Sequence, residues 1–299
     1  MDPSDRMGTR ITVASRRLRP VSHGLERLNC YRAAVETATV ARHSTMTRAE
    51  LQREPIRATW LGRVPYREAW LLQKRLAAAR ADGLIGDRLL LLEHPAVLTL
   101  GRQADERHIL ATQEVLSARG IEVLRVERGG EVTYHGPGQL VAYPILSLSS
   151  RGLLVRPLVR ALEGAMVATC AAAGVHAARR DGHPGCWCEP DGVEPRKIGA
   201  LGLRVERSVS YHGIALNVAP DLADFDLIDA CGMPGVASTS IAREAGRPDE
   251  APSTAAVERA AWTFANALAA ELGADLEVGI PADLEQVSVL AATAPAATR

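Results

Sequence analysis

The sequence predicts an α+β fold, with a mixed or antiparallel sheet and flanking helices. Apolar strand patterns outnumber helical ones, and several follow one another without an intervening helix. No Gly-x-Gly-x-x-Gly motif follows a strand and no Gly-x-x-x-x-Gly-Lys-Ser/Thr motif occurs, so the dinucleotide-binding and P-loop folds lack their signatures. A hydrophobic share of 47% with a charged share of 23% is typical of a globular protein and excludes disorder throughout.

Each predicted strand is an apolar or alternating run bounded by turn residues. In order, the strands are 56–64, 88–94, 96–102, 121–127, 139–148, 185–189, 197–207 and 209–219. The last two are separated by Ser208 and have the length and polarity of a hairpin. Apolar residues at helical spacing predict helices at 65–82, 157–173 and 253–272, each followed by a glycine.

The chain divides into three segments. Residues 1–55 show no sustained period and are expected to form a poorly ordered extension, while the Ala-, Thr- and Pro-rich residues 281–299 are expected to form a flexible tail. Residues 56–280 are compatible with one domain.

Charge and cysteine content narrow the functional class. A net charge of +0 gives no global field to hold a polyanion, and no apolar run approaches the ~18–20 residues that span a bilayer, so neither nucleic acid nor membrane is an expected partner. Five cysteines without a secretory signal indicate a reducing compartment. We therefore expect a cytoplasmic protein, with a mitochondrial location as the alternative because residues 6–32 are rich in arginine.

The densest chemical motif is Arg128 to Pro144, with the sequence RGGEVTYHGPGQLVAYP. Its glycines remove side chains where another surface approaches the backbone, and exposed amides there can bind a carbonyl or phosphate. A hairpin loop would explain the glycines and the proline. It would not require Arg128, Tyr134, His135 and Gln139 together.

Cys231 is the best candidate for a nucleophile, because it lies in a loop with Gly232 and Pro234 beside it. A cysteine thiol with a pKa of about 8.5 is only a few per cent ionised near neutral pH, so the role requires an activating partner. Lys197, His135 and His212 are the candidates. A metal site formed by the two histidines with Cys231 is a minority interpretation, since the histidines lack local ligand spacing.

Other residues have simpler explanations. Cys170 lies in an Ala-rich predicted helix and is expected to be a small buried hydrophobe. Cys186 and Cys188 alternate on a strand, so both should face the same side and pack there. Lys74 and Lys197 are the only lysines among 35 basic residues, and Lys74 falls on the exposed face of a helix.

Four motifs in this order closely resemble those of the lipoyl(octanoyl) transferases. They are RGGEVTYHGPGQLVAYPI (128–145), RKIGALGLRV (196–205), SYHGIALNV (210–218) and ACGMPG…STS (230–240), with EHPAVLTLGR (93–102) as a further match. The resemblance covers about residues 57–275. It implies a fold related to the catalytic domain of biotin protein ligase and lipoate ligase.

The resemblance also implies roles for individual residues. The acyl-thioester cysteine of the family falls on Cys231 and its activating lysine on Lys197. The substrate-binding stretches match Arg128, Gly129, Gly130, Glu131, Val132, Thr133, Tyr134, His135, Ala200, Leu201, Gly202, Gly213, Ile214 and Ala215. This chain departs from the family at Cys186-Trp187-Cys188, and it inserts residues 189–195 before the lysine.

The implied activity is transfer of an octanoyl or lipoyl group from acyl carrier protein to a lysine. The implied acceptors are the apo lipoyl domains of 2-oxoacid dehydrogenase E2 subunits and the H protein of glycine cleavage. A monomer without cofactor or metal is expected. The alternatives are an ATP-dependent lipoate-protein ligase and a non-catalytic acyl-carrier-binding protein.

Overall fold

The structure, a computed structural model, describes residues 54–284 of the 299-residue chain. The described strands are β1 (Ile56–Arg63), β2 (Arg88–Glu93), β3 (Val97–Leu100), β4 (Glu122–Arg125), β5 (Val132–His135), β6 (Gln139–Ile145), β7 (Ala178–Arg180), β8 (His183–Cys188), β9 (Arg196–Glu206), β10 (Val209–Asn217) and β11 (Leu276–Val278). The α-helices are α3 (Tyr66–Ala81), α4 (Gln113–Ala118), α5 (Val155–Ala172), α6 (Ile241–Glu244) and α7 (Thr254–Glu271). The larger sheet has the order β11-β1-β2-β6-β10-β9-β8-β7, and the smaller one β4-β3-β5.

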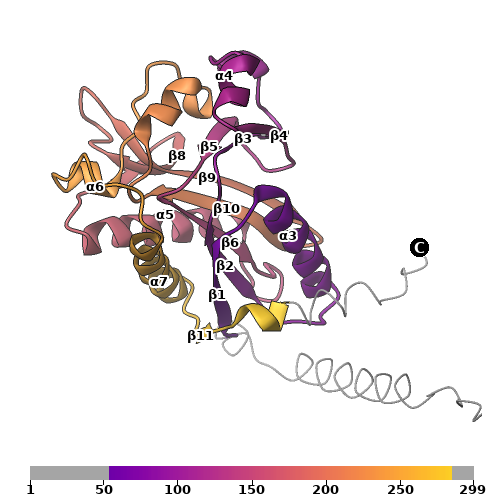
Figure 1. Cartoon of the computed structure of the whole chain (residues 1–299). Coiled ribbons are helices and arrows are strands. Elements are labelled where there is room, and N and C mark those ends of the chain that lie inside the picture. The colour runs from indigo at the N-terminus through magenta and orange to yellow at the C-terminus, as the bar shows by residue number, and fades with distance from the viewer. Residues whose placement is uncertain (1–53, 285–299) are drawn as a thin grey trace, which may run out of the picture.

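Helices cover both faces of the larger sheet, with α5 and α7 on one face and α3 on the other (Figure 1). In β2, Leu89 and Leu91 join the core under α5 and α7, whereas Leu90 and Leu92 join the core under α3. Side chains of a strand alternate between faces, so a strand covered on both sides is apolar throughout. The unbroken leucine run is therefore explained by the interior position of β2.

The smaller sheet packs on a core of its own. Leu98, Val132 and Tyr134 meet Phe225 there. No strand is expected from the sequence in the glycine-rich residues 128–138, but the structure places strand β5 there, paired antiparallel with β3. Four residues are too few to display a period, so only the pairing with β3 identifies this strand.

The predicted hairpin is confirmed. Arg207 and Ser208 connect β9 to β10, with φ angles of 49° and 62°. Two left-handed residues are typical of the two-residue turns that match the twist of paired strands. In the resulting register Gly213 pairs with Gly202 and Ala215 with Ala200, so two of the predicted substrate-binding stretches face each other across the hairpin.

The α+β class is confirmed. The short elements α4, β7 and β11 were not predicted from the sequence. The predicted extension 1–55 and tail 281–299 lie outside the described residues except at their inner ends, where Glu54 ion-pairs with Arg80 and Leu284 is buried. No helix within residues 54–284 combines the length and apolar character required to cross a membrane.

The buried carboxylate of Asp87 offers a test of fold stability, because it is hydrogen-bonded to residues from separate segments of the chain. It accepts hydrogen bonds from Arg80 Nε at 2.6 Å, Arg151 Nε at 2.5 Å and the Ser147 amide at 2.9 Å. We predict that Asp87→Ala lowers the free energy of unfolding by about 3–5 kcal/mol, since bonds to two buried guanidinium groups are lost. Urea unfolding followed by circular dichroism measures this.

The matched control is Asp82→Ala. Asp82 forms an ion pair with Arg207 in which both side chains are about half exposed, so its removal should cost less than about 1 kcal/mol. Equal losses in the two variants would contradict the role given to Asp87.

Candidate active site

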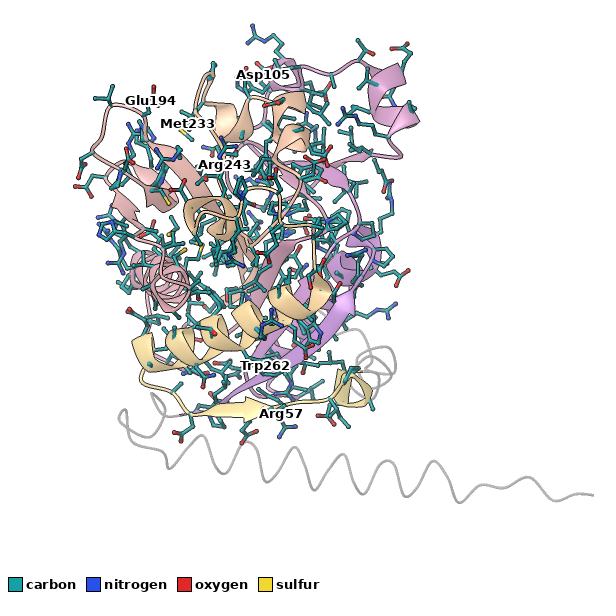
Figure 2. The ribbon with its side chains drawn as sticks, turned by 60° about the vertical axis from the view of Figure 1, so that its left-hand side comes forward. Arg57, Asp105, Glu194, Met233, Arg243 and Trp262 are labelled. Atoms are coloured by element: carbon teal, nitrogen blue, oxygen red, sulfur yellow. The ribbon has the colours of Figure 1, made fainter. Side chains whose placement is uncertain are left out.

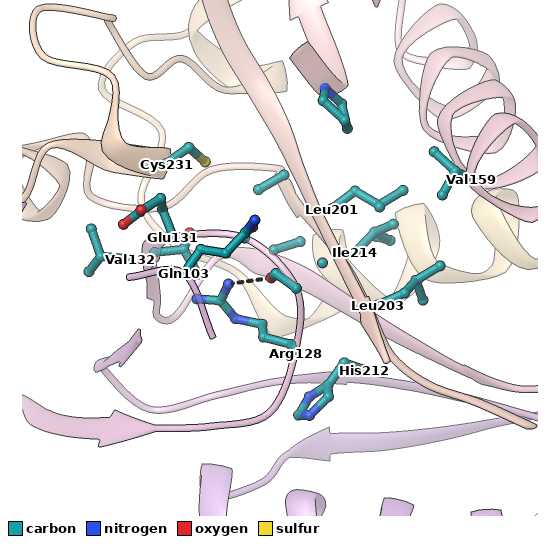
Figure 3. Close-up of a pocket in the computed structure, with 18 of the residues that line it drawn as sticks. Gln103, Arg128, Glu131, Val132, Val159, Leu201, Leu203, His212, Ile214 and Cys231 are labelled. Carbon is teal, nitrogen blue, oxygen red and sulfur yellow. Dashed lines mark hydrogen bonds between the residues drawn. The ribbon is translucent and has the colours of Figure 1, made fainter. Parts of the chain in front are cut away.

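Cys231 lies on the short turn η3 (Ala230–Gly232) and is partly exposed. Its φ of 59° is in the left-handed region, which costs a residue with a side chain about 1–2 kcal/mol. Figure 3 shows Cys231 and Glu131 on one side of a cavity, with Val159 and Leu203 on the other. A strained, partly exposed thiol at a cavity is the arrangement expected of a reactive residue rather than a packing residue.

Lys197 is the partner that the fold brings to this thiol. Its Nζ lies 3.2 Å from Cys231 Sγ and donates a hydrogen bond to it. The backbone fixes this distance, because the Lys197 amide donates to Ala237 O at 2.9 Å and the Thr239 amide donates to Lys197 O at 2.9 Å. The segment that follows Cys231 is therefore attached to the start of β9.

The cavity beside this pair has a volume of about 500 Å³, within the size range of small-molecule sites. Leu201, Leu203, Ile214 and Val159 give it an apolar side (Figure 3). Both Cys231 and Lys197 line it. An aliphatic chain attached to Cys231 therefore has an apolar surface within reach.

All three predicted substrate-binding stretches reach this cavity, and every residue of them lines it except Tyr134. The Tyr134 hydroxyl instead donates to Asp224 Oδ2 at 2.5 Å, and its ring packs against Phe225. Alternation along β5 places Tyr134 on the face opposite to Thr133 and His135, towards the core of the smaller sheet. Val132 shares the face of Tyr134 but still reaches the cavity from the first position of the strand.

Two glycines of these stretches are required by close backbone approach. A Cβ at Gly202 would lie 2.7 Å from Gly129 O, and a Cβ at Gly213 would lie 2.0 Å from Ala142 O. Both distances are far below ordinary contact, so a side chain would push the 128–131 segment away from β9 at Gly202, and β6 away from β10 at Gly213. The glycines let the 128–131 segment and β6 close around the cavity.

Arg128 is a buried cation that lines the cavity. Its Nη2 donates to Thr99 O at 2.7 Å and to Thr99 Oγ1 at 2.9 Å, and its Nη1 donates to Gly129 O at 3.0 Å. Burial lowers the pKa of Arg128 below its usual value. These neutral oxygens fix the guanidinium and hold together the glycine motif and β3.

Two histidines lie close to Arg128, because His135 shares the Thr99 hydroxyl with the guanidinium and the His94 ring contacts the His135 ring. His94 Nδ1 is 2.6 Å from Val64 O, which can only accept, so this nitrogen carries the proton and Nε2 accepts from the Tyr143 hydroxyl at 2.8 Å. His135 Nδ1 is 2.8 Å from Gln139 Oε1. Burial lowers the pKa of His94 to about 4 and that of His135 well below its ordinary value.

His212 also lines the cavity, and sequence analysis gave it no place in the matched substrate-binding stretches. It has a φ of 55°, is 1% exposed, and neither ring nitrogen has a hydrogen-bond partner within the described part of the chain. Burial lowers its pKa to about 3. The sequence carries a signal for this residue, because the Tyr-His-Gly step of the matched stretch at 134–136 recurs at 211–213.

The other described cysteines match their simpler interpretation. Cys170, Cys186 and Cys188 are buried in the core under α5 and α7, whereas Cys231 is partly exposed. Residues 54–284 contain no group of three His, Cys, Asp or Glu side chains placed to hold a metal ion.

The buried histidines predict a stability that depends on pH. They are neutral in the folded protein and take up protons on unfolding below about pH 6.5, so the free energy of unfolding is highest above that pH. It should fall as the pH drops towards 5, by up to about 1.4 kcal/mol per pH unit for each such histidine. Urea unfolding between about pH 7 and 5 measures the slope, in a window where carboxylates stay largely ionised.

His94→Gln should reduce this slope, whereas His176→Gln should leave it unchanged because His176 is exposed. Parallel pH curves for wild type and His94→Gln would contradict the assignment.

Comparison with known proteins identifies the family. The model of the lipoyl protein ligase A/B catalytic domain matches residues 65–261. An octanoyltransferase of Acidobacterium capsulatum is 50% identical over 192 residues, which are 62% of this chain and 78% of that protein. An octanoyltransferase of Mycobacterium bovis is 45% identical over 221 residues, covering 73% of this chain and 88% of its own.

Solved structures show the same fold at low identity. A bipartite lipoate protein ligase from Thermoplasma acidophilum has a TM-score of 0.59 at 15% identity, covering 81% of this chain and 93% of its own. A lipoate-protein ligase A bound with ATP has a TM-score of 0.56 at 18% identity, covering 80% and 95%. By the family model and these relatives, the chain belongs to the lipoyl protein ligase A/B catalytic domain family and, within it, to the octanoyltransferases, which are acyltransferase enzymes.

Proposed function

We propose that this octanoyltransferase takes its acyl group from acyl carrier protein, holds it as a thioester on Cys231, and delivers it to a lysine of an apo lipoyl domain. The acceptors are the lipoyl domains of 2-oxoacid dehydrogenase E2 subunits and the H protein of glycine cleavage. The observation that carries the proposal is the 3.2 Å contact between Lys197 Nζ and Cys231 Sγ at the cavity.

In the first step the Cys231 thiolate attacks the carbonyl carbon of the donor thioester. The new C–S bond forms as the bond to the carrier's sulfur breaks, and the Lys197 ammonium gives its proton to the leaving thiolate. The carrier departs as a thiol, and Lys197 is left as a neutral amine. An ammonium 3.2 Å from the sulfur is close enough for this proton transfer.

In the second step the ε-amine of the acceptor lysine attacks the acyl-enzyme. The amide bond forms, the bond to Cys231 Sγ breaks, and the neutral Lys197 amine takes up the proton that the attacking nitrogen releases. The thiolate and ammonium are thereby restored. The apolar side of the cavity, with Leu201 and Ile214, would hold the aliphatic chain between the two steps.

A thioester donor is already activated, so the reaction needs no ATP. An ATP-dependent lipoate-protein ligase would instead use free octanoate with ATP, and an acyl-carrier-binding protein would form no product. A single-turnover reaction with octanoyl-carrier and an apo lipoyl domain, run beside one with octanoate and ATP, separates the three. Product only from the second mixture would overturn the proposal.

Intact-mass analysis tests the nucleophile. After incubation with octanoyl-carrier and no acceptor, we expect one octanoyl adduct on the wild-type protein and none on Cys231→Ala, because that sulfur is the proposed acceptor. Cys188→Ala is the control, since Cys188 is buried in the core. Full transfer activity in Cys231→Ala would refute the covalent intermediate.

Two substitutions separate the possible roles of Lys197. Lys197→Ala removes both charge and proton, so thiol alkylation near neutral pH and octanoyl transfer should both fall. Lys197→Arg keeps a charge but cannot exchange its proton, so alkylation should be partly retained while transfer falls by about 10²–10⁴. Iodoacetamide alkylation against pH and transfer rates measure the two roles.

Lys74→Arg is the matched control, because it changes the other lysine of the chain, whose side chain is 52% exposed on α3. Wild-type transfer rates in Lys197→Arg would show that charge alone suffices.

A further inference from the structure

The Lys197 ammonium has an unusual set of neighbours for a buried charge. Lys197 is 9% exposed, and within residues 54–284 no carboxylate forms an ion pair with it. Its Nζ contacts are Cys231 Sγ at 3.2 Å and the ring of Trp187, whose centroid lies 4.9 Å away. Buried charges are costly unless something compensates them, so the aromatic ring supplies part of what a carboxylate would otherwise provide.

The sheet register explains why the ring is there. Trp187 on β8 pairs directly with Lys197 on β9, so their side chains are cross-strand neighbours. The Trp187 indole is fully buried, and its Nε1 donates to His183 O at 3.0 Å, which fixes the rotation of the ring. Gly185, two residues earlier, gives room for the lysine stem, since a Cβ there would lie 3.0 Å from Lys197 Cε.

A second cation lies over the same ring. Arg180 Cζ is 5.0 Å from the Trp187 centroid, and Arg180 comes from β7. Since β8 lies between β7 and β9 in the sheet, the two cations reach the indole from its two neighbouring strands. The Trp187 ring therefore attracts both the guanidinium of Arg180 and the ammonium of Lys197.

We propose that Trp187 is a positioning residue for Lys197, and that its π face holds the ammonium beside Cys231 and favours the thiolate there. The proposal rests on the proposed function only in taking Cys231 and Lys197 as the reacting pair. Trp187 does not touch the acyl group in this scheme and acts through the lysine. A ring that only fills the core would be replaceable by any side chain of similar size.

The experiment measures alkylation of Cys231 by iodoacetamide near neutral pH in the full-length protein. Trp187→Leu should slow alkylation by roughly three- to thirty-fold, the range of a partly or fully desolvated cation–π contact. Trp187→Phe, which keeps a π face, should restore most of the rate. Because no acyl donor is used, a failure of the octanoyl-transfer proposal would leave this result unaffected.

Trp70→Leu is the matched control. Lys74 Nζ lies 5.1 Å from the Trp70 centroid, so the same type of contact is removed at a distance from Cys231. The rate of Cys231 alkylation in Trp70→Leu should equal that of the wild type.

A second set of variants keeps the test valid if Trp187→Leu does not fold. Fluorinated tryptophans introduced at position 187 by nonsense suppression preserve size and the Nε1–H bond while withdrawing π density in steps. The alkylation rate should fall with each added fluorine at constant thermal stability, and octanoyl transfer should fall with it. A flat series would overturn the proposal and leave Trp187 as a packing residue.

Discussion

The site depends on the backbone pairing between the start of β9 and the segment that follows Cys231. Lys197 exchanges backbone hydrogen bonds with Ala237 and Thr239, so a loop without regular structure is held to the edge of a long hairpin. This pairing sets the contact between Lys197 Nζ and Cys231 Sγ. Met233, two residues after Cys231, lies at the opposite end of the molecule from Arg57 and Trp262 (Figure 2).

A line of side-chain hydrogen bonds links the glycine motif to the same loop. It runs through Arg128, Thr99, His135, Gln139, Asn217 and the carbonyl of Thr239. All of these hydrogen bonds are buried. A buried polar group without a partner costs free energy, so each side chain of the network keeps its neighbours in position. This explains why a glycine-rich segment also carries an arginine, a histidine and a glutamine: the cavity wall and the cysteine loop are positioned by one network.

Much of the fold followed from local patterns. The leucine run of β2, the hairpin turn at Arg207 and Ser208, and the three long helices were predictable because period and turn chemistry act over a few residues. Strand β5 was not, because four residues inside a glycine-rich segment have no readable period. Tyr134 was placed among the substrate-binding residues by resemblance, but alternation along β5 turns it away from the cavity.

The sequence by itself determined which residue types were available: one loop cysteine, two lysines, and a glycine motif that no simple turn requires. Chemistry alone left Lys197, His135 and His212 open as partners of Cys231, and resemblance to a family favoured the lysine. Only the tertiary structure decided which side chains meet, including the Trp187 ring against the lysine. Such distances depend on strand order and register between residues far apart in the chain, which no local pattern encodes.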